Sequence, residues 1–139
     1  MVKKLFTLEE ANALLPRLKE DLRQLQDASG KFETLLLEYQ KMKAIHKQAF
    51  QSPDGKHDPF FETESRLEFM KMETDLLIEN FKRKGVLLKM VSPGLIDFPA
   101  ELDGEEVLIC WKEGEERATH YHGWNDGFAG RKPYPEEGN

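Results

Sequence analysis

Apolar residues recur at alternating spacings of three and four positions through the first third of the chain. This spacing places them along one side of a helix, as in the seam of a coiled coil. Directly before the run, Thr7 and Glu10 stand three positions apart and predict a capping box that starts the helix. The seam comprises Leu15, Leu18, Leu22, Leu25, Ser29, Phe32, Leu36, Tyr39, Lys43, His46 and Phe50.

Pro16 lies early in this helix and has no amide hydrogen to donate. Because its ring also clashes with the preceding turn, we expect a kink or a restart near Ala13–Leu15. A turn at 51–58 then leads into a second helix that Asp58 caps. Residues 1–85 are therefore predicted to form a long antiparallel helical hairpin, coiled-coil-like and kinked near the proline.

The two helices differ in length, which leaves part of the first one without a partner. At 1.5 Å per residue, residues 8–50 span roughly 64 Å and residues 59–84 only roughly 39 Å. The apolar stripe Leu8–Leu25 therefore needs another surface. Three solutions remain open: it covers a sheet, it folds back at Gly30, or it meets another subunit.

After Gly85, which is expected to end the second helix, the apolar period changes from 3.6 to 2. Asp103-Gly104 between two apolar runs is a strong hairpin signal. We predict an antiparallel β-meander followed by a glycine-rich loop at 123–134. Together with the helices it makes one α+β domain, with a helical part at 1–85 and a β part at 86–139. The expected strands are Val86–Val91, Leu95–Leu102, Val107–Lys112 and Ala118–His122.

Charge and cysteine content narrow the function classes. The formal net charge is −6, and it falls entirely within residues 86–139, so no basic cluster suits nucleic acid. No apolar run approaches the roughly 20 residues that cross a bilayer. Cys110 is the single cysteine, which fits a reducing compartment. We expect a soluble, cytoplasmic protein that binds neither nucleic acid nor membrane.

The segment from His120 to Arg131 holds the densest mixture of chemical groups in the chain. His120 and His122 are two positions apart, so on a strand both imidazoles share one face. If Gly114-Glu115 forms a two-residue turn, Ile109 lies opposite His120, and Cys110 points to the other face. A one-residue change in the turn would move Cys110 to the histidine face.

The histidine pair is half of a possible transition-metal site, since zinc takes three or four nitrogen, oxygen or sulfur ligands. His120, His122 and Asp126 are the predicted ligands of a divalent metal such as zinc, with Asp97 as an alternative third ligand. Two histidines without a paired Cys or Glu motif are a weak signal, and we favour the other interpretation, in which they are half-buried beside Trp111 and hydrogen-bonded.

Asp97 lies between apolar residues, and an unpaired carboxylate there is costly to bury. Arg131 is the expected partner, because its guanidinium can bind a carboxylate through two hydrogen bonds. One interpretation is a structural salt bridge that holds the glycine loop on the sheet. The other uses Asp97 and His122 as acid and base, with Arg131 binding an anionic substrate. No residue has the context of a covalent nucleophile.

Motifs along nearly the whole chain resemble an uncharacterised prokaryotic family, domain of unknown function family 2203. The resemblance implies a long helical region followed by a small β region, and it implies no activity. Tyr121-His122 stands at the family's Trp-His pair, and His120 has no counterpart there. The matching segments are Phe6–Pro16, Gly85-Val86, Leu88-Lys89, Gly94–Ala100, Val107–Trp111, Gly114-Glu115, His122, Gly127–Arg131 and Pro133.

Two functional hypotheses follow from these patterns. The first is a non-enzymatic interaction or regulatory module that binds another protein or forms a homo-oligomer through the stripe Leu8–Leu25. The second is a small-molecule or metal site in the β region, with hydrolysis as its candidate activity.

Overall fold

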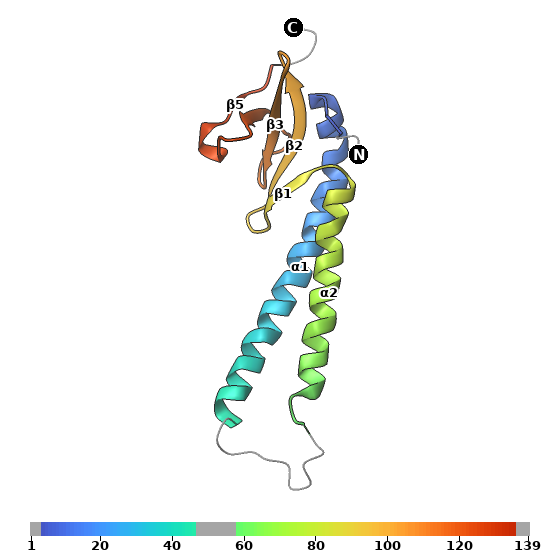
Figure 1. Cartoon of the computed structure of the whole chain (residues 1–139), viewed down its shortest axis with the longest axis vertical. Coiled ribbons are helices and arrows are strands. Elements are labelled where there is room, and N and C mark those ends of the chain that lie inside the picture. The colour runs from blue at the N-terminus through green and yellow to red at the C-terminus, as the bar shows by residue number, and fades with distance from the viewer. Residues whose placement is uncertain (1–3, 47–57, 136–139) are drawn as a thin grey trace.

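The computed structural model of the chain describes residues 4–46 and 58–135. Two helices lie side by side and are followed by a five-stranded antiparallel sheet beside the N-terminal end of the first helix (Figure 1). The expected α+β class is confirmed. The elements are α1 (Leu8–His46), α2 (Phe61–Arg83), β1 (Leu87–Met90), β2 (Leu95–Leu102), β3 (Glu105–Lys112), β4 (His120–Gly123), the short 3₁₀ helix η1 (Phe128–Gly130) and β5 (Lys132–Pro133).

Local signals start and end the helices as expected. The Thr7 hydroxyl accepts from the Glu10 amide at 3.0 Å, and the Glu10 carboxylate accepts from the Thr7 amide at 2.9 Å. This reciprocal pair is the expected capping box. Before α2, the Asp58 carboxylate accepts from the Phe60 amide at 2.9 Å. After α2, Gly85 takes a φ of +82°, which a glycine adopts without strain. The rest of the turn expected at 51–58 lies outside the described residues.

The kink expected near Ala13–Leu15 is not confirmed, because α1 is helical without interruption and contains Pro16. Leu15 and Leu18, on either side of the proline, are 2% and 0% exposed. Their burial stabilises the helix where the missing amide hydrogen weakens it.

The stripe Leu8–Leu25 covers the sheet. Of the three arrangements expected for it, the structure therefore shows the first. Its side chains share one core with the helix-facing side of β2 and β3, and the end of α2 closes that core. The stripe therefore has its covering surface within the chain itself. The core comprises Phe6, Leu8, Ala11, Leu15, Leu18, Leu22, Leu25, Phe81, Val86, Ile96, Phe98, Ala100, Val107, Ile109, Trp111 and Ala118.

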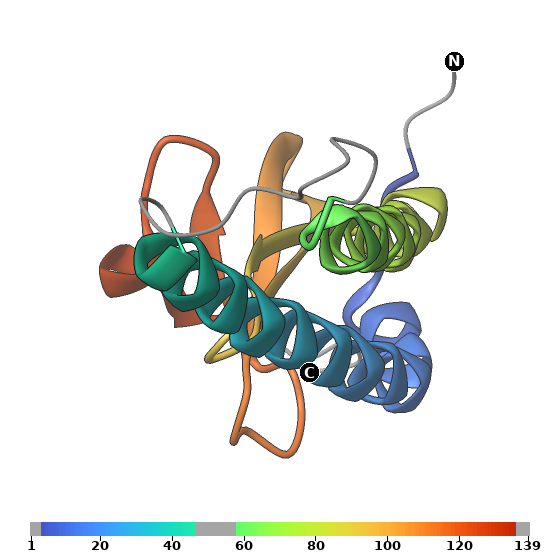
Figure 2. The same cartoon turned by 90° about the horizontal axis from the view of Figure 1, so that it is seen from below.

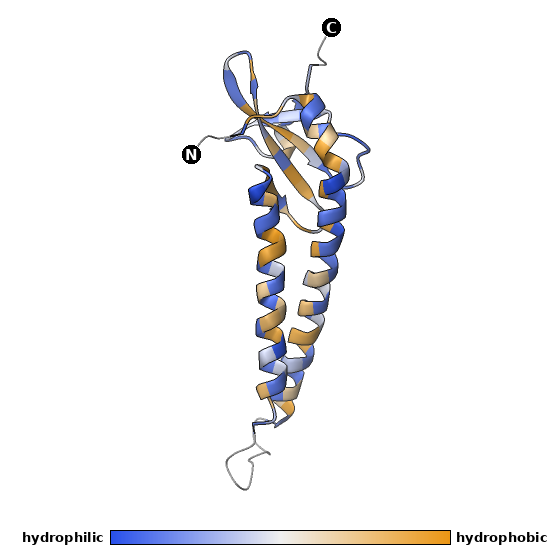
Figure 3. Cartoon of the chain, turned by 90° about the vertical axis from the view of Figure 1, so that its right-hand side faces the viewer, coloured by the Kyte–Doolittle hydropathy of each residue, from blue (hydrophilic) through white to orange (hydrophobic). Residues whose placement is uncertain are grey.

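Beyond Leu25 the character of the helices changes. The buried side chains of α1 end at that residue, and α2 contributes Leu67 and Phe81. Figure 3 shows the two helices extending well past the sheet, with apolar and polar residues mixed along them. Neither helix that the structure describes has a stretch apolar and long enough to cross a bilayer.

The strands run in the order β1-β2-β3-β4-β5, as a meander. Asp103 and Gly104 have φ values of 54° and 82° and form the tight turn between β2 and β3. The next connection is longer and is attached to α1. The Asn12 amide nitrogen donates to the Ala118 carbonyl at 3.0 Å, and the Asn12 oxygen accepts from the Ala118 amide at 2.7 Å. In place of a loop throughout 123–134, the structure has η1 and the short strand β5.

Candidate metal centre

Three side chains from adjacent strands meet on the face of the sheet that points away from the helices. Side chains alternate between faces along a strand, and Ile96 and Phe98 face the helical core. Asp97 therefore points the other way, as do Cys110, its register partner in β3, and His122 in β4. Their exposed fractions are 2%, 2% and 6%. One possible ligand atom from each lies within 4.8 Å of the other two.

Cys110 joins this group because the expected register of β3 and β4 is wrong by one residue. Cys110, and not Ile109, lies opposite His120. The connection runs from residue 113 to 119, so it is longer than a two-residue turn. The Trp111 indole donates to the Glu115 carbonyl at 2.8 Å and holds the start of this connection. Because the register shifts by one position, the sulfur moves to the opposite face of the sheet.

The imidazole of His122 is oriented by the backbone. Its Nδ1 lies 2.9 Å from the carbonyl oxygen of Gly123, and a carbonyl only accepts, so Nδ1 carries the hydrogen. Its Nε2 faces Asp97 Oδ2 at 3.3 Å. In neutral imidazole this nitrogen presents a lone pair toward a carboxylate oxygen that also presents lone pairs. A hydrogen atom or a metal ion between the two atoms would complete this contact.

Burial dominates the electrostatics of this group. It raises the pKa of Asp97 above its ordinary value, against the opposing effects of His122 and of a hydrogen bond with Cys110. Burial, together with the charge of Asp97, raises the pKa of the Cys110 thiol to about 12. A thiol protonated at neutral pH and 2% exposed is no nucleophile.

Arg131 pairs with Glu115, so the expected Asp97–Arg131 salt bridge is wrong. The guanidinium donates to the two oxygens of Glu115 at 3.1 and 2.5 Å and stacks 4.3 Å above the centroid of the Phe128 ring. These contacts attach η1 to the connection after β3. Asp97 has His122 instead, because the register of β2, β3 and β4 brings their side chains together on one face.

The other predicted ligands are not members of the buried group, although His120 lies opposite Cys110 in the register of β3 and β4. His120 is half-buried, and its Nδ1 is 2.8 Å from the hydroxyl of Thr119. Asp126 is exposed, and its carboxylate accepts from the Gly123 amide at 3.3 Å. Among the residues that the structure describes, the set that could hold a metal comprises Asp97, Cys110 and His122. The sequence pointed to Cys110 in one way: a change of one residue in the length of the turn after β3 would place its side chain on the same face as the histidines.

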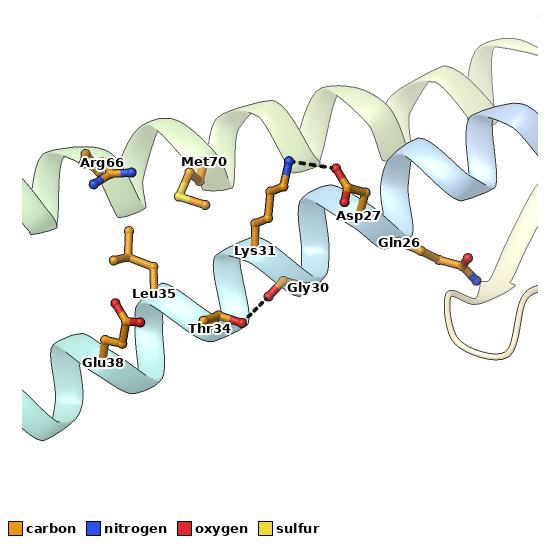
Figure 4. A pocket seen from close by; sticks show the side chains of 9 residues that line it. All are labelled: Gln26, Asp27, Gly30, Lys31, Thr34, Leu35, Glu38, Arg66 and Met70. Atoms are coloured by element: carbon orange, nitrogen blue, oxygen red, sulfur yellow. Dashed lines mark hydrogen bonds and ion pairs between the residues drawn. The ribbon is translucent and has the colours of Figure 1, made fainter.

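One hollow on the surface lies away from this group. Figure 4 shows this hollow of about 540 Å³ between α1 and α2, around Gly30. Its polar groups make contacts within one helix: Lys31 binds Asp27 at 3.0 Å, and the Thr34 hydroxyl donates to the Gly30 carbonyl at 3.0 Å. Such contacts are typical of an open groove between helices rather than of a catalytic cleft.

A family model described as "Uncharacterized conserved protein (DUF2203)" matches residues 4–134. No curated protein and no solved structure matches the chain. The match spans all three side chains of the buried group.

Proposed function

The chain belongs to the DUF2203 family, and we propose that its β region binds one transition-metal ion of the zinc class between Asp97, Cys110 and His122. The observation that carries the proposal is the orientation of His122. Metal-binding histidines usually donate their second ring nitrogen to a carbonyl or carboxylate, which directs the other nitrogen at the metal. Gly123 supplies such a carbonyl at 2.9 Å, and the second ring nitrogen, Nε2, faces Asp97 Oδ2 at 3.3 Å in the cluster that also contains Cys110.

The chemistry of the three groups supports the same conclusion. Carboxylate oxygen, thiolate sulfur and imidazole nitrogen are the ligand types that zinc takes in proteins. The alternative occupant is a proton shared by His122 and Asp97. A metal would in addition use the sulfur of Cys110, because it displaces the thiol proton.

The burial of the group favours a structural or regulatory metal over a hydrolytic one. A catalytic metal keeps a coordination position open to substrate, whereas these side chains are at most 6% exposed. The metal would join β2, β3 and β4 on the face that the helices leave uncovered. We therefore infer a non-enzymatic module whose β region is stabilised when the metal is bound.

The test is metal binding by the full chain, prepared metal-free and titrated with zinc or with cobalt(II) as a spectroscopic substitute. We expect one ion per chain, a cobalt–thiolate charge-transfer band, and a higher melting temperature with zinc. Cys110→Ala and His122→Ala should each weaken binding by more than the roughly 10–100-fold that loss of a second-shell group costs.

His120→Ala and Asp126→Asn are the matched controls, because they remove the ligands expected from the sequence and leave the buried group intact. Both should bind the ion as the parent does. A parent chain that takes up no zinc and gives no cobalt band would overturn the proposal. Binding that survives Cys110→Ala and His122→Ala would also overturn it.

A further inference from the structure

The buried group of Asp97, Cys110 and His122 needs a cover that the helices do not supply. It lies on the face of the sheet that points away from them, and yet Leu108 and Cys110 on that face are 0% and 2% exposed. Another part of the chain must therefore shield them. Figure 1 shows the segment between β4 and β5, in red, on the side of the sheet away from α1. Seen from below, the strands lie between η1 and α2 (Figure 2).

Two side chains of this segment, residues 124–131, reach over β3. The Phe128 ring centroid lies 5.2 Å from Lys112 Nζ, and Lys112 points to the same face as Cys110 because it stands two positions further along the strand. The Arg131 guanidinium lies within hydrogen-bonding reach of the Cys110 thiol. Burial raises the pKa of that thiol, and Arg131 acts in the opposite direction. The segment therefore passes over the thiol side of the buried group.

Arg131 attaches this segment to the connection after β3. Residues 124–130 are exposed, and backbone hydrogen bonds within the segment join near neighbours, as where the Gly130 amide donates to the Gly127 carbonyl at 3.0 Å. Such bonds fix the shape of the segment and not its position on the sheet. The two hydrogen bonds from Arg131 to Glu115 fix that position. An exposed segment with local bonds opens more readily than a packed core.

We propose that residues 124–131 are a strap over the metal site, that the Arg131–Glu115 pair is its latch, and that release of the latch sets the rate at which the ion enters and leaves. The inference rests on the proposed function, since it concerns the route to that site. Because the strap contributes no ligand to the buried group, releasing it changes the rates in both directions and leaves the affinity nearly unchanged.

The first experiment uses the metal-free full chain, so its result does not depend on metal binding. Cys110 is the single cysteine, and its alkylation by iodoacetamide, followed by mass spectrometry, reports how often the strap opens. Glu115→Ala and Arg131→Ala should each speed alkylation by about 5-fold or more, the factor expected for loss of a well-aligned, partly exposed ion pair. Arg131→Ala also removes a charge that favours the thiolate, so a faster reaction there reports access and not a more reactive sulfur.

Leu67→Ala is the matched control for lost stability. Leu67 is buried on α2 and belongs to neither the strap nor the sheet, so its loss weakens the fold and leaves the latch intact. Because opening of the strap is local, this variant should be alkylated at the rate of the parent. Circular dichroism checks that all variants are folded under the conditions of the reaction.

The second experiment loads the chain with zinc and follows its transfer to an excess of chelator. Both latch variants should release zinc about 5-fold faster or more, with a zinc affinity within about 3-fold of the parent. Alkylation of folded latch variants at the parent's rate would overturn the strap, whether or not the chain binds zinc. Faster alkylation without faster release would also overturn the proposal, because the ion would then leave by another path.

The two experiments separate this inference from the proposed function. A parent chain that takes up no zinc removes the metal site and with it the route of the ion. The alkylation rates then still show whether residues 124–131 cover Cys110.

Discussion

At the scale of single residues, Gly94 shows how closely the sheet approaches α1. A Cβ at this position would lie 2.3 Å from Leu22 Cδ2 and 3.2 Å from Leu22 Cδ1. Leu22 is 2% exposed and packed in the core, so it has little space to move. The backbone of Gly94 is also held on both sides: its amide donates to the Glu113 carboxylate, and its carbonyl accepts from the Glu113 amide, each at 2.8 Å.

We therefore expect Gly94→Ala to lower the free energy of unfolding by about 1–3 kcal/mol, the usual cost of overpacking a core. Urea unfolding at neutral pH measures it. Gly127→Ala is the control, because that glycine has a φ of −92° and nothing within 4 Å of the added Cβ. A Gly94→Ala variant as stable as the control would mean that Leu22 moves aside freely.

At the scale of elements, the connection at 113–119 and the segment carrying η1 depend on Glu115. Burial raises the pKa of this carboxyl, but the hydrogen bonds from Arg131 and from the Lys112 amide outweigh burial and hold the pKa below its ordinary value of 4.5. A lowered carboxyl pKa stabilises the folded chain at every pH above the ordinary value. That stabilisation disappears as the pH falls through the folded value.

Glu115→Gln should therefore cost roughly 1 kcal/mol of stability at neutral pH, the size of a well-aligned and partly exposed Arg–carboxylate pair. The difference from the parent should shrink as the pH falls below about 4.5 and the parent carboxyl takes up its proton. Unfolding measured at pH 7 and at roughly pH 3 tests this. Glu116→Gln, at an exposed neighbouring position, is the control and should show no such pH dependence. If Glu115→Gln loses the same stability at both pH values, the ion pair of Glu115 with Arg131 is not the cause of the loss.

At the scale of the whole molecule, the helix pair has two different halves. The N-terminal half of α1 belongs to the core of the sheet, whereas the distal half has few buried side chains. Leu18 is 0% exposed and Leu37 is 58% exposed, although both stand on one continuous helix. Stability should therefore depend on where along α1 a leucine is removed.

Leu18→Ala should destabilise the chain by about 2–5 kcal/mol, because it leaves a cavity between α1 and the sheet. Leu37→Ala should change stability by no more than about 0.5 kcal/mol. Thermal unfolding of both variants, measured at the same low protein concentration, makes the comparison. In Leu18→Ala we expect the circular dichroism signals of the strands and of the helices to be lost together. Equal effects of the two substitutions would show that the distal half is as well packed as the half against the sheet.

The sequence by itself determined the features that depend on neighbouring residues. The capping box of Thr7 and Glu10, the positive φ of Gly85 and the Asp103-Gly104 turn all follow from local backbone preferences. Periodicity determined where helix changes to strand, because a side chain's face depends only on its position within the element. The sequence also identified Asp97 as a buried carboxylate in need of a partner.

Only the tertiary structure decided which distant groups meet. The stripe Leu8–Leu25 covers the sheet rather than another subunit, and Asp97 meets His122 rather than Arg131. Cys110 joins them because the connection at 113–119 is longer than a two-residue turn. The physical reason is that a strand has a period of two, so one residue more or less in a loop exchanges the faces of every side chain that follows. The length of the connection at 113–119, which no local sequence pattern determines, therefore decides which side chains form the candidate metal site.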